Sequence, residues 1–257
     1  MPDTEPVFRK TPDPAGDGSG AILPVAVATR FLQWGSLGLI LPVSNLFRLS
    51  KGLSLGELGF SAAFVSAVVI LLEVPTGILA DRIGRRRVYL ASLAFFALSC
   101  LTLLASRGFL SVTAGFALYG VSRALSSGSL EALLIDRYLE REGEGRLHRL
   151  MAATNAADTA GLALGSLAGG FVPMGWAILA PGTGPYDGNL IAMLALTAAL
   201  AGIVLLAVPE EPPRAGGRES VGSFLSGSLR AITGSRELAL ILATMVAWGF
   251  AFSAVET

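Results

Sequence analysis

Long apolar runs separated by short polar segments make up the chain from residue 21 onwards. A helix needs roughly 20 mostly apolar residues to cross a lipid bilayer. Six complete runs approach or exceed that length: Ala21–Leu46, Leu55–Leu79, Val88–Ala105, Phe109–Ile135, Leu150–Val172 and Asn189–Val208. A seventh run, Leu238–Val255, is followed only by Glu256 and Thr257. The pattern predicts an all-α membrane protein with a six-helix bundle over residues 21–208 and the start of a seventh helix over residues 238–257.

Two polar segments flank the six runs. Residues 1–20 are rich in Pro, Gly and Asp, which predicts a disordered tail rather than a cleaved signal peptide. Residues 209–237 begin as PEEPPRAGGRE, a composition typical of a solvated linker. Later in this segment apolar residues recur at helical spacing, at Val221, Phe224, Leu225, Leu229 and Ile232. We therefore expect a linker that carries an amphipathic helix on the membrane surface.

Arginine and lysine predict the orientation, because cytoplasmic loops of membrane proteins carry an excess of both. One set of alternate loops holds only Arg48, Lys51 and Arg107. The other set holds the remaining loop residues of this kind, Arg9, Lys10, Arg82, Arg85, Arg86, Arg87, Arg137, Arg141, Arg146, Arg149, Arg214, Arg218, Arg230 and Arg236. The N-terminus and the linker are thus predicted to be cytoplasmic. Because no transit or signal segment is present, we expect a multi-pass protein of the cell inner (plasma) membrane.

Composition narrows the class of protein. The chain is 53% hydrophobic and only 15% charged, which excludes an ordinary soluble domain. Its formal net charge is zero, so we expect membrane lipid and a small molecule as partners and no nucleic acid. The single cysteine, Cys100, excludes an intrachain disulfide and a thiolate metal site. No HExxH, GxSxG or GxxxxGK(S/T) sequence occurs, so we expect no enzyme, no metal, no cofactor and no use of ATP.

Several charged or strongly polar residues lie inside the predicted spans. A charge near the centre of a spanning helix costs about 2.5 to 3.5 kcal/mol on insertion scales, so it needs a partner, a watery cavity or a function. The residues are Arg30 and Gln33 in the first span, Glu73 in the second, Arg123 and Glu131 in the fourth, Asn155 and Asp158 in the fifth, and Glu256 after the seventh.

The sequence leaves two interpretations open for these groups. Glu73 is either a carboxyl group hydrogen-bonded to a neighbouring helix or a proton-titrating site whose ionisation follows its hydration. Asp158 is the next candidate proton site, unless it only packs against polar neighbours. Arg30 and Arg123 are expected to face the interior and to pair either with these acids or with an anionic substrate. The candidates for lining a cavity are Arg30, Gln33 and Asn155.

Two features indicate how the helices pack. Pro75 removes a backbone donor and predicts a kink in the second span. In the fifth span, GLALGSLAGG places small residues four apart, which lets another backbone approach closely. The stripe consists of Gly161, Gly165, Gly169 and Gly170. Helix packing alone explains it, and a functional motif is the alternative.

The segment GILADRIGRRR, at residues 77–87, resembles the loop motif GxLaDrxGrkxxl of the major facilitator superfamily. The matching residues are Gly77, Leu79, Ala80, Asp81, Arg82, Gly84, Arg85 and Arg86. In the family this motif lies on the cytoplasmic side between the second and third spans, which is where the runs and the arginines place it in this chain.

This resemblance implies a gate made by Gly77, Asp81, Arg82, Gly84, Arg85 and Arg86. Gly77 would let the second helix approach a helix of the family's other half, and Gly84 would permit the tight turn before the third span. Asp81 could hold an arginine or accept from a helix N-terminus. Asp136 and Arg137, at the inner end of the fourth span, are candidates for a partner within this chain.

Two further resemblances are partial. The glycine stripe is similar to the antiporter motif gxxxGPxxGG, with Ser166 where the family has proline. LYGVSRALSSGS is similar to the fourth-span motif lxxxRxxqGxgaa, although Ser126 replaces the glutamine and the glycine is displaced to Gly128. The family associates this arginine, here Arg123, with proton coupling. The stretch LEVPTGILADRIGRRR also looks like the drug-efflux branches of the superfamily.

Family members have twelve spans in two halves around a central cavity, so the resemblance implies that this chain is the N-terminal half plus the start of the seventh span. The leading hypothesis is a secondary transporter, present as a partial chain, that exports a small amphipathic compound in exchange for protons. The proton-coupling candidates are Glu73, Asp158, Arg123 and Glu131. Uptake of a nutrient or metabolite is an alternative that Ser166 favours. An inactive fragment or a membrane interaction protein is another.

Overall fold

The computed structural model describes residues 22–210 and Leu240, and all regular elements in that part of the chain are helices. The α-helices are α1 (Ile22–Ile40), α2 (Ser44–Ser50), α3 (Leu55–Ile83), α4 (Arg85–Leu104), α5 (Phe109–Ser126), α6 (Leu130–Glu142), α7 (Leu147–Leu179) and α8 (Asp187–Ala207), with 3-10 helices at Leu41–Val43 and Glu144–Arg146. The predicted tail, nearly all of the linker and the seventh run apart from Leu240 lie outside the described residues. The expected all-α bundle is confirmed.

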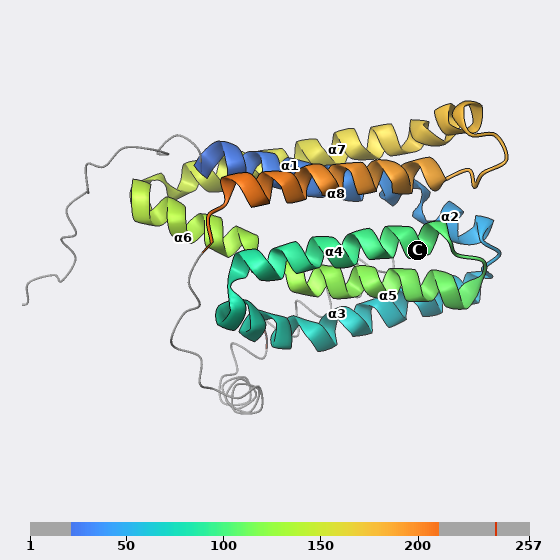
Figure 1. Ribbon diagram of the computed structural model, residues 1–257, viewed down its shortest axis with the longest axis horizontal. Coiled ribbons are helices and arrows are strands. Elements are labelled where there is room, and N and C mark those ends of the chain that lie inside the picture. The colour runs from blue at the N-terminus through green and yellow to red at the C-terminus, as the bar shows by residue number, and fades with distance from the viewer. Residues whose placement is uncertain (1–21, 211–239, 241–257) are drawn as a thin grey trace, which may run out of the picture.

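Six long helices of the described part form two groups of three (Figure 1). In one group α1 packs against α7 and α8, and in the other α5 packs against α3 and α4. The groups meet where α4 packs against α8. In chain order the six long helices form two triplets, α1–α3–α4 and α5–α7–α8. The first helix of each triplet packs on the second and third helices of the other triplet. This exchange is the pattern of two internal repeats.

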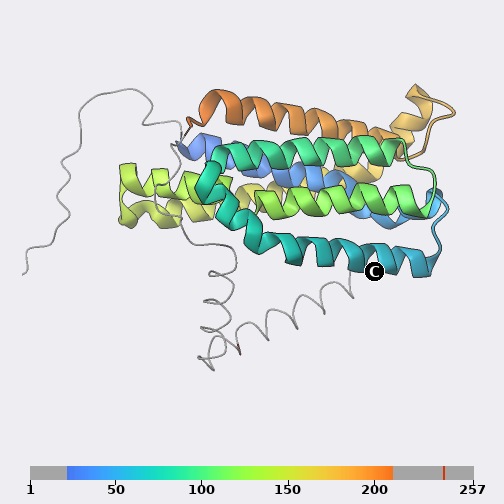
Figure 2. The same ribbon diagram turned by 60° about the horizontal axis from the view of Figure 1, so that its bottom comes forward.

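Five helical segments of the described residues are long and apolar enough to cross a bilayer, namely Ile22–Ser50, Leu55–Glu73, Arg85–Leu104, Glu144–Leu179 and Asp187–Ala207. Helix α5 is not among them, because its 18 residues include Arg123 and several serines and glycines. It nevertheless runs beside α3 and α4 in both views (Figures 1 and 2). Neighbouring helices thus accommodate a helix that is more polar than the others.

The fourth predicted span, Phe109–Ile135, is wrong as a single helix. Helix α5 ends at Ser126 and α6 begins at Leu130. Between them Gly128 has a φ of 68°, a left-handed conformation that a residue with a Cβ adopts at a cost. The sequence signal was present, because Ser126–Ser129 reads SSGS, a cluster typical of turns.

The first predicted span also ends early. Helix α1 stops at Ile40, and Pro42 lies in the first turn of the 3-10 helix Leu41–Val43 that follows. Proline fits the first turn of a helix because the N–H that it lacks has no partner there. By contrast, Pro75 lies inside α3, which continues to Ile83. Figure 2 shows α3 bending toward its C-terminal end, as expected where proline removes a backbone hydrogen bond.

The glycine stripe of α7 packs directly on α1. A Cβ at Gly161, Gly165 or Gly169 would overlap a backbone carbonyl of α1, that of Phe31, Gly35 or Leu39 respectively. Gly170 faces open space, so it takes no part in this contact. The packing interpretation therefore accounts for three of the four glycines.

Asn189, which is fully buried on α8, ties the same interface together. Its Nδ2 donates to the carbonyls of Leu39 on α1, at 2.7 Å, and Gly169 on α7, at 2.8 Å. Helix α8 thus donates hydrogen bonds to a carbonyl on α1 and a carbonyl on α7. The hydrocarbon of a membrane offers such carbonyls no donor.

The described arginine-rich segments gather at one end of the bundle, where α3 joins α4, α6 leads into α7 and α8 ends (Figure 1). Contacts with the end of α8 hold this region together. Arg86 donates to the carbonyl of Leu205 at 2.8 Å, Arg137 donates to that of Pro209 at 3.1 Å, and Arg87 pairs with Glu210. The side of the membrane on which this end lies stays a prediction.

Candidate functional site

A cavity of about 380 Å³ lies between the two groups of helices. Its wall combines side chains from α1, α3, α4, α5, α6 and α8 with the turn between α5 and α6. Trp34, Phe96 and Tyr119 supply aromatic surface, and Arg30, Glu73, Arg123 and Glu131 supply charge. A mostly apolar cavity with a few charged groups is typical of a small-molecule site.

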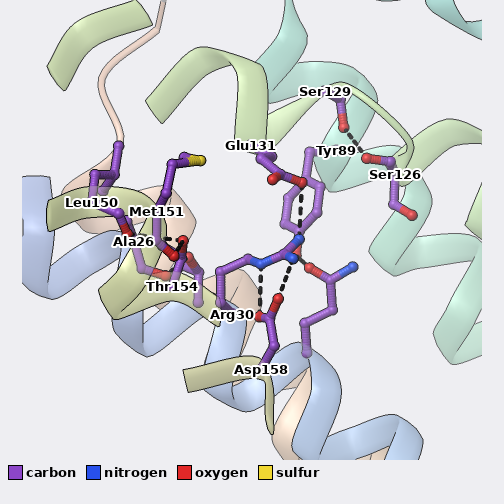
Figure 3. A network of polar contacts seen from close by, with 12 residues as sticks. Ala26, Arg30, Tyr89, Ser126, Ser129, Glu131, Leu150, Met151, Thr154 and Asp158 are labelled. Carbon is purple, nitrogen blue, oxygen red and sulfur yellow. Dashed lines mark hydrogen bonds and ion pairs between the residues drawn. The ribbon is translucent and has the colours of Figure 1, made fainter. Parts of the chain in front are cut away.

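Arg30 is the centre of the polar network in this region (Figure 3). Its Nε donates to Asp158 Oδ1 at 2.8 Å and its Nη2 donates to Asp158 Oδ2. Its Nη1 donates to Glu131 Oε2 at 3.0 Å. The arginine side chain is 19% exposed. Of the two partners that the sequence left open for Arg30, the structure provides the acids.

These three residues meet because of how the helices pack. Arg30 lies on α1 and Asp158 on α7, the two helices that the glycine stripe brings together. Glu131 is in the first turn of α6, directly after the turn at Gly128. The break between α5 and α6, which apolar length did not predict, therefore places Glu131 beside Arg30.

Two further contacts belong to the same region. The buried Tyr89 of α4 donates its hydroxyl proton to Gln33 Oε1 at 3.2 Å. Gln33 lines the cavity as expected, whereas Asn155 is exposed and is not among the residues that line it.

Glu73 lies on the opposite wall of the cavity and is exposed. Its Oε1 accepts a hydrogen bond from Ser127 Oγ at 3.1 Å. One turn along α3, the buried hydroxyl of Thr76 lies 2.8 Å from the carbonyl of Ala124 on α5. In a continuous helix the carbonyl of Ala124 would accept from the N–H of Gly128. Because α5 ends before Gly128, Thr76 of α3 takes the place of that donor. No motif in the sequence had indicated Thr76 or Ser127.

Arg123 also lines the cavity and is exposed. No ion pair or hydrogen bond of its guanidinium occurs within the described part of the chain. It therefore differs from Arg30, whose charge is compensated by two acids.

The predicted gating motif forms the junction of α3 and α4. Gly84 has a φ of 100° and lies between the two helices, as expected for a tight turn. Arg85 Nη1 donates to Asp136 Oδ2 on α6 at 2.8 Å, and its Nε lies 3.6 Å from Asp81 Oδ1. Asp136 is thus a partner within the chain, as the sequence suggested. A Cβ at Gly77 would contact nothing in the described part of the chain. Asp81 and Arg82 are exposed on the last turns of α3.

The comparisons with known proteins agree on the fold. A family model described as Major Facilitator Superfamily matches residues 25–257. A search of curated proteins finds no match. Among solved structures, the crystal structure of the human organic anion transporter MFSD10 (TETRAN) is similar, with a TM-score of 0.54 and 20% sequence identity. The match covers 76% of this chain and 49% of that chain, so the chain spans about half the length of the similar structure.

At this identity the structural likeness establishes the fold alone. The family match, however, extends over nearly the whole chain and agrees with the loop motif at Gly77–Arg86 in its required place between two membrane helices. Members of this family are multi-pass membrane proteins that bind small molecules. The chain therefore belongs to the major facilitator superfamily.

Proposed function

We propose that the protein is a secondary active transporter that exports a small amphipathic compound in exchange for protons. The observation that carries this proposal is the cavity between α1 and α5, in which Arg30 is shared by Asp158 and Glu131. Ionisable groups within membrane-spanning helices are costly and mark ion or substrate pathways. The aromatic wall suits the apolar part of a substrate.

The chain supplies one side of such a transporter. The family's second six-helix half would complete the cavity and would contribute the helix against which Gly77 and Asp81 close. In this arrangement the ion pairs of Arg85 with Asp81 and Asp136 hold the cytoplasmic gate. The inner (plasma) membrane and a cytoplasmic N-terminus follow from the positive-inside rule.

A transport assay tests this proposal. The full-length protein is reconstituted into vesicles with an imposed proton gradient, and the flux of a fluorescent aromatic cation is followed. We expect flux that depends on the gradient and that weakens in the E73Q and D158N variants. Gradient-independent leakage equal to that of empty vesicles would contradict export in exchange for protons.

A second candidate is transport of an organic anion, by uptake or by export. Arg123 favours it, because this cavity guanidinium makes no ion pair in the described structure and is available to a carboxylate. MFSD10 is named as an organic anion transporter. In the same vesicles a fluorescent aromatic carboxylate replaces the cation, and R123Q must then lose the flux. Equal flux in wild type and R123Q would exclude this role.

A further inference from the structure

Arg30 binds its two carboxylates unequally. Asp158 receives two hydrogen bonds, one from Nε at 2.8 Å and one from Nη2. Glu131 receives one, from Nη1 at 3.0 Å. The side chain of Asp158 is 16% exposed and that of Glu131 is 49% exposed. One carboxylate is thus buried and held twice, whereas the other is half exposed and held once.

The charges of this cluster do not balance when both acids are ionised, because one guanidinium faces two carboxylates. An uncompensated charge is costly inside a membrane bundle. One proton on either carboxyl group would make the cluster neutral. The geometry of the two contacts has to decide which carboxyl group takes this proton.

The geometry favours Glu131. Charge-assisted hydrogen bonds stabilise the ionised form of a carboxyl group. Protonation would weaken two such bonds at Asp158 but only one at Glu131. Glu131 lines the cavity, and Asp158 is not among the lining residues, so water in the cavity can deliver a proton directly to Glu131.

We propose that Glu131 takes up and releases the transported proton, and that Asp158 is a positioning residue that holds Arg30 in place. This inference rests on the proposed proton-coupled transport and assigns its proton to one of the candidates.

The proton step is simple in chemical terms. A proton from cavity water binds the Glu131 carboxylate, and the Nη1 contact changes from an ion pair to a hydrogen bond with a neutral acid. Arg30 keeps its charge and its two bonds to Asp158. The charge of the cluster rises from −1 to zero, and no other bond forms or breaks.

Proton uptake at this position has a structural consequence. Glu131 lies in the first turn of α6, just beyond the turn at Gly128. Its ion pair with Arg30 therefore joins the start of α6 to α1. When Glu131 is protonated this joint weakens, because a hydrogen bond to a neutral acid replaces the ion pair.

Other groups around the cavity are placed differently. Glu73 of α3 accepts from Ser127, Arg123 of α5 makes no ion pair among the described residues, and Tyr89 of α4 donates to Gln33. None of these is bonded to the Arg30 guanidinium. Arg123 and Glu73 carry opposite charges and line the same cavity, so they act on the cluster only through space.

Infrared difference spectroscopy of the full-length protein in detergent, between alkaline and acid pH, tests the assignment without any substrate. We expect the carbonyl stretch of a protonated carboxyl group, lost in E131Q and retained in D158N. The control is E140Q, which replaces an exposed acid outside the cavity and should also retain the band. A band retained in E131Q, or one lost in D158N instead, would overturn the proposal. If E131Q does not fold, E131D should keep the band, and the pH at which the band is half formed should shift. An unchanged pH midpoint in E131D would contradict the proposal.

Two further measurements test the positioning role of Asp158 and distinguish this inference from the proposed function. Thermal unfolding should show a lower midpoint for D158N than for E131Q, because only D158N removes the bidentate partner of Arg30, and the reverse order would contradict the positioning role. In vesicles, E131Q should lose proton-driven flux at least about tenfold, a loss of about 1.4 kcal/mol of coupling. If E131Q retains full proton-driven flux, this inference is wrong and the proposed function stands. If the wild type shows no proton-driven flux but the infrared band still belongs to Glu131, the proposed function is wrong and the assignment of the proton stands.

Discussion

At the scale of single residues, Arg30 does the most to organise the site. It joins α1 to α6 and α7, which lie far away in the sequence, through Glu131 and Asp158. Arginine suits this role because its planar guanidinium presents several donors in fixed directions. Lysine carries the same charge but cannot form the bidentate contact together with a third hydrogen bond.

The first prediction follows from this difference. Arg30→Lys should lower the free energy of unfolding by about 1.5 to 3 kcal/mol, the range for a lost charged hydrogen bond. The measurement is thermal or denaturant unfolding in detergent. Arg123→Lys is the matched control, since Arg123 makes no ion pair among the described residues, and it should change stability much less. Equal losses in the two variants would contradict the role given to Arg30.

At the scale of helices, two glycine features decide where the site residues lie. The stripe on α7 lets its backbone contact α1, and Gly128 separates α6 from α5. Bilayers provide no hydrophobic force between helices, so small residues and buried hydrogen bonds such as those of Asn189 stabilise the contact.

The second prediction concerns the stripe. Gly165→Ala should destabilise the protein by at least about 1 to 3 kcal/mol, the usual cost of overpacking, because the group in its way is the backbone of Gly35 rather than a flexible side chain. Gly170→Ala is the control, because a Cβ at this position would contact nothing among the described residues. Alanine has the higher helix propensity, so the stability of this variant should be unchanged or slightly higher. Melting temperatures in detergent distinguish the two. A smaller loss for Gly165→Ala than for Gly170→Ala would be inconsistent with this interface.

The third prediction concerns the turn between α5 and α6. Gly128→Ala should lower stability by about 1 to 2 kcal/mol, because alanine is strained at a φ of 68°. Gly56→Ala, at an exposed position inside α3 with open space around it, should instead raise stability by up to about 1 kcal/mol. Unfolding curves of both variants provide the comparison. A stabilising Gly128→Ala would mean that α5 and α6 are continuous.

At the scale of the whole molecule, the bundle has one arginine-rich end and one end with few charges. The gating motif, the start of α7 and the end of α8 lie at the first, and the turns that follow α4 and α7 lie at the second (Figure 1). The positive-inside rule predicts that the arginine-rich end faces the cytoplasm.

The fourth prediction tests this orientation by cysteine labelling. Because Cys100 is the only cysteine among residues 1–257 and is buried, Cys100→Ala removes the thiol background of this chain. Added to it, Glu144→Cys at the arginine-rich end and Pro181→Cys at the other end are both at exposed positions. A membrane-impermeant maleimide applied to intact cells should label Pro181→Cys and leave Glu144→Cys unlabelled until the membrane is opened. The opposite result reverses the topology.

Much of the fold could be predicted from local sequence. Apolar length located the six long helices, because the bilayer requires roughly 20 apolar residues per span. It predicted both ends closely for the second, third and sixth runs. The first, fourth and fifth runs end at residues 46, 135 and 172, whereas their helices end at residues 40, 126 and 179. The loop motif and its arginines indicated the family, and the gating role of its residues stays a prediction. Gly84 and Asp136 then had the roles expected of them, a turn with positive φ and an ion pair with Arg85.

Tertiary structure alone decided which polar groups meet. The sequence placed Arg30, Glu131 and Asp158 in spans but left their partners open, since pairing depends on which helices pack and on where a helix breaks. The turn at Gly128 and the glycine contact between α1 and α7 settled both points. Hydrophobicity along the chain reports burial in lipid at each position, whereas an ion pair depends on distances between segments that are remote in the sequence, and only packing fixes those distances.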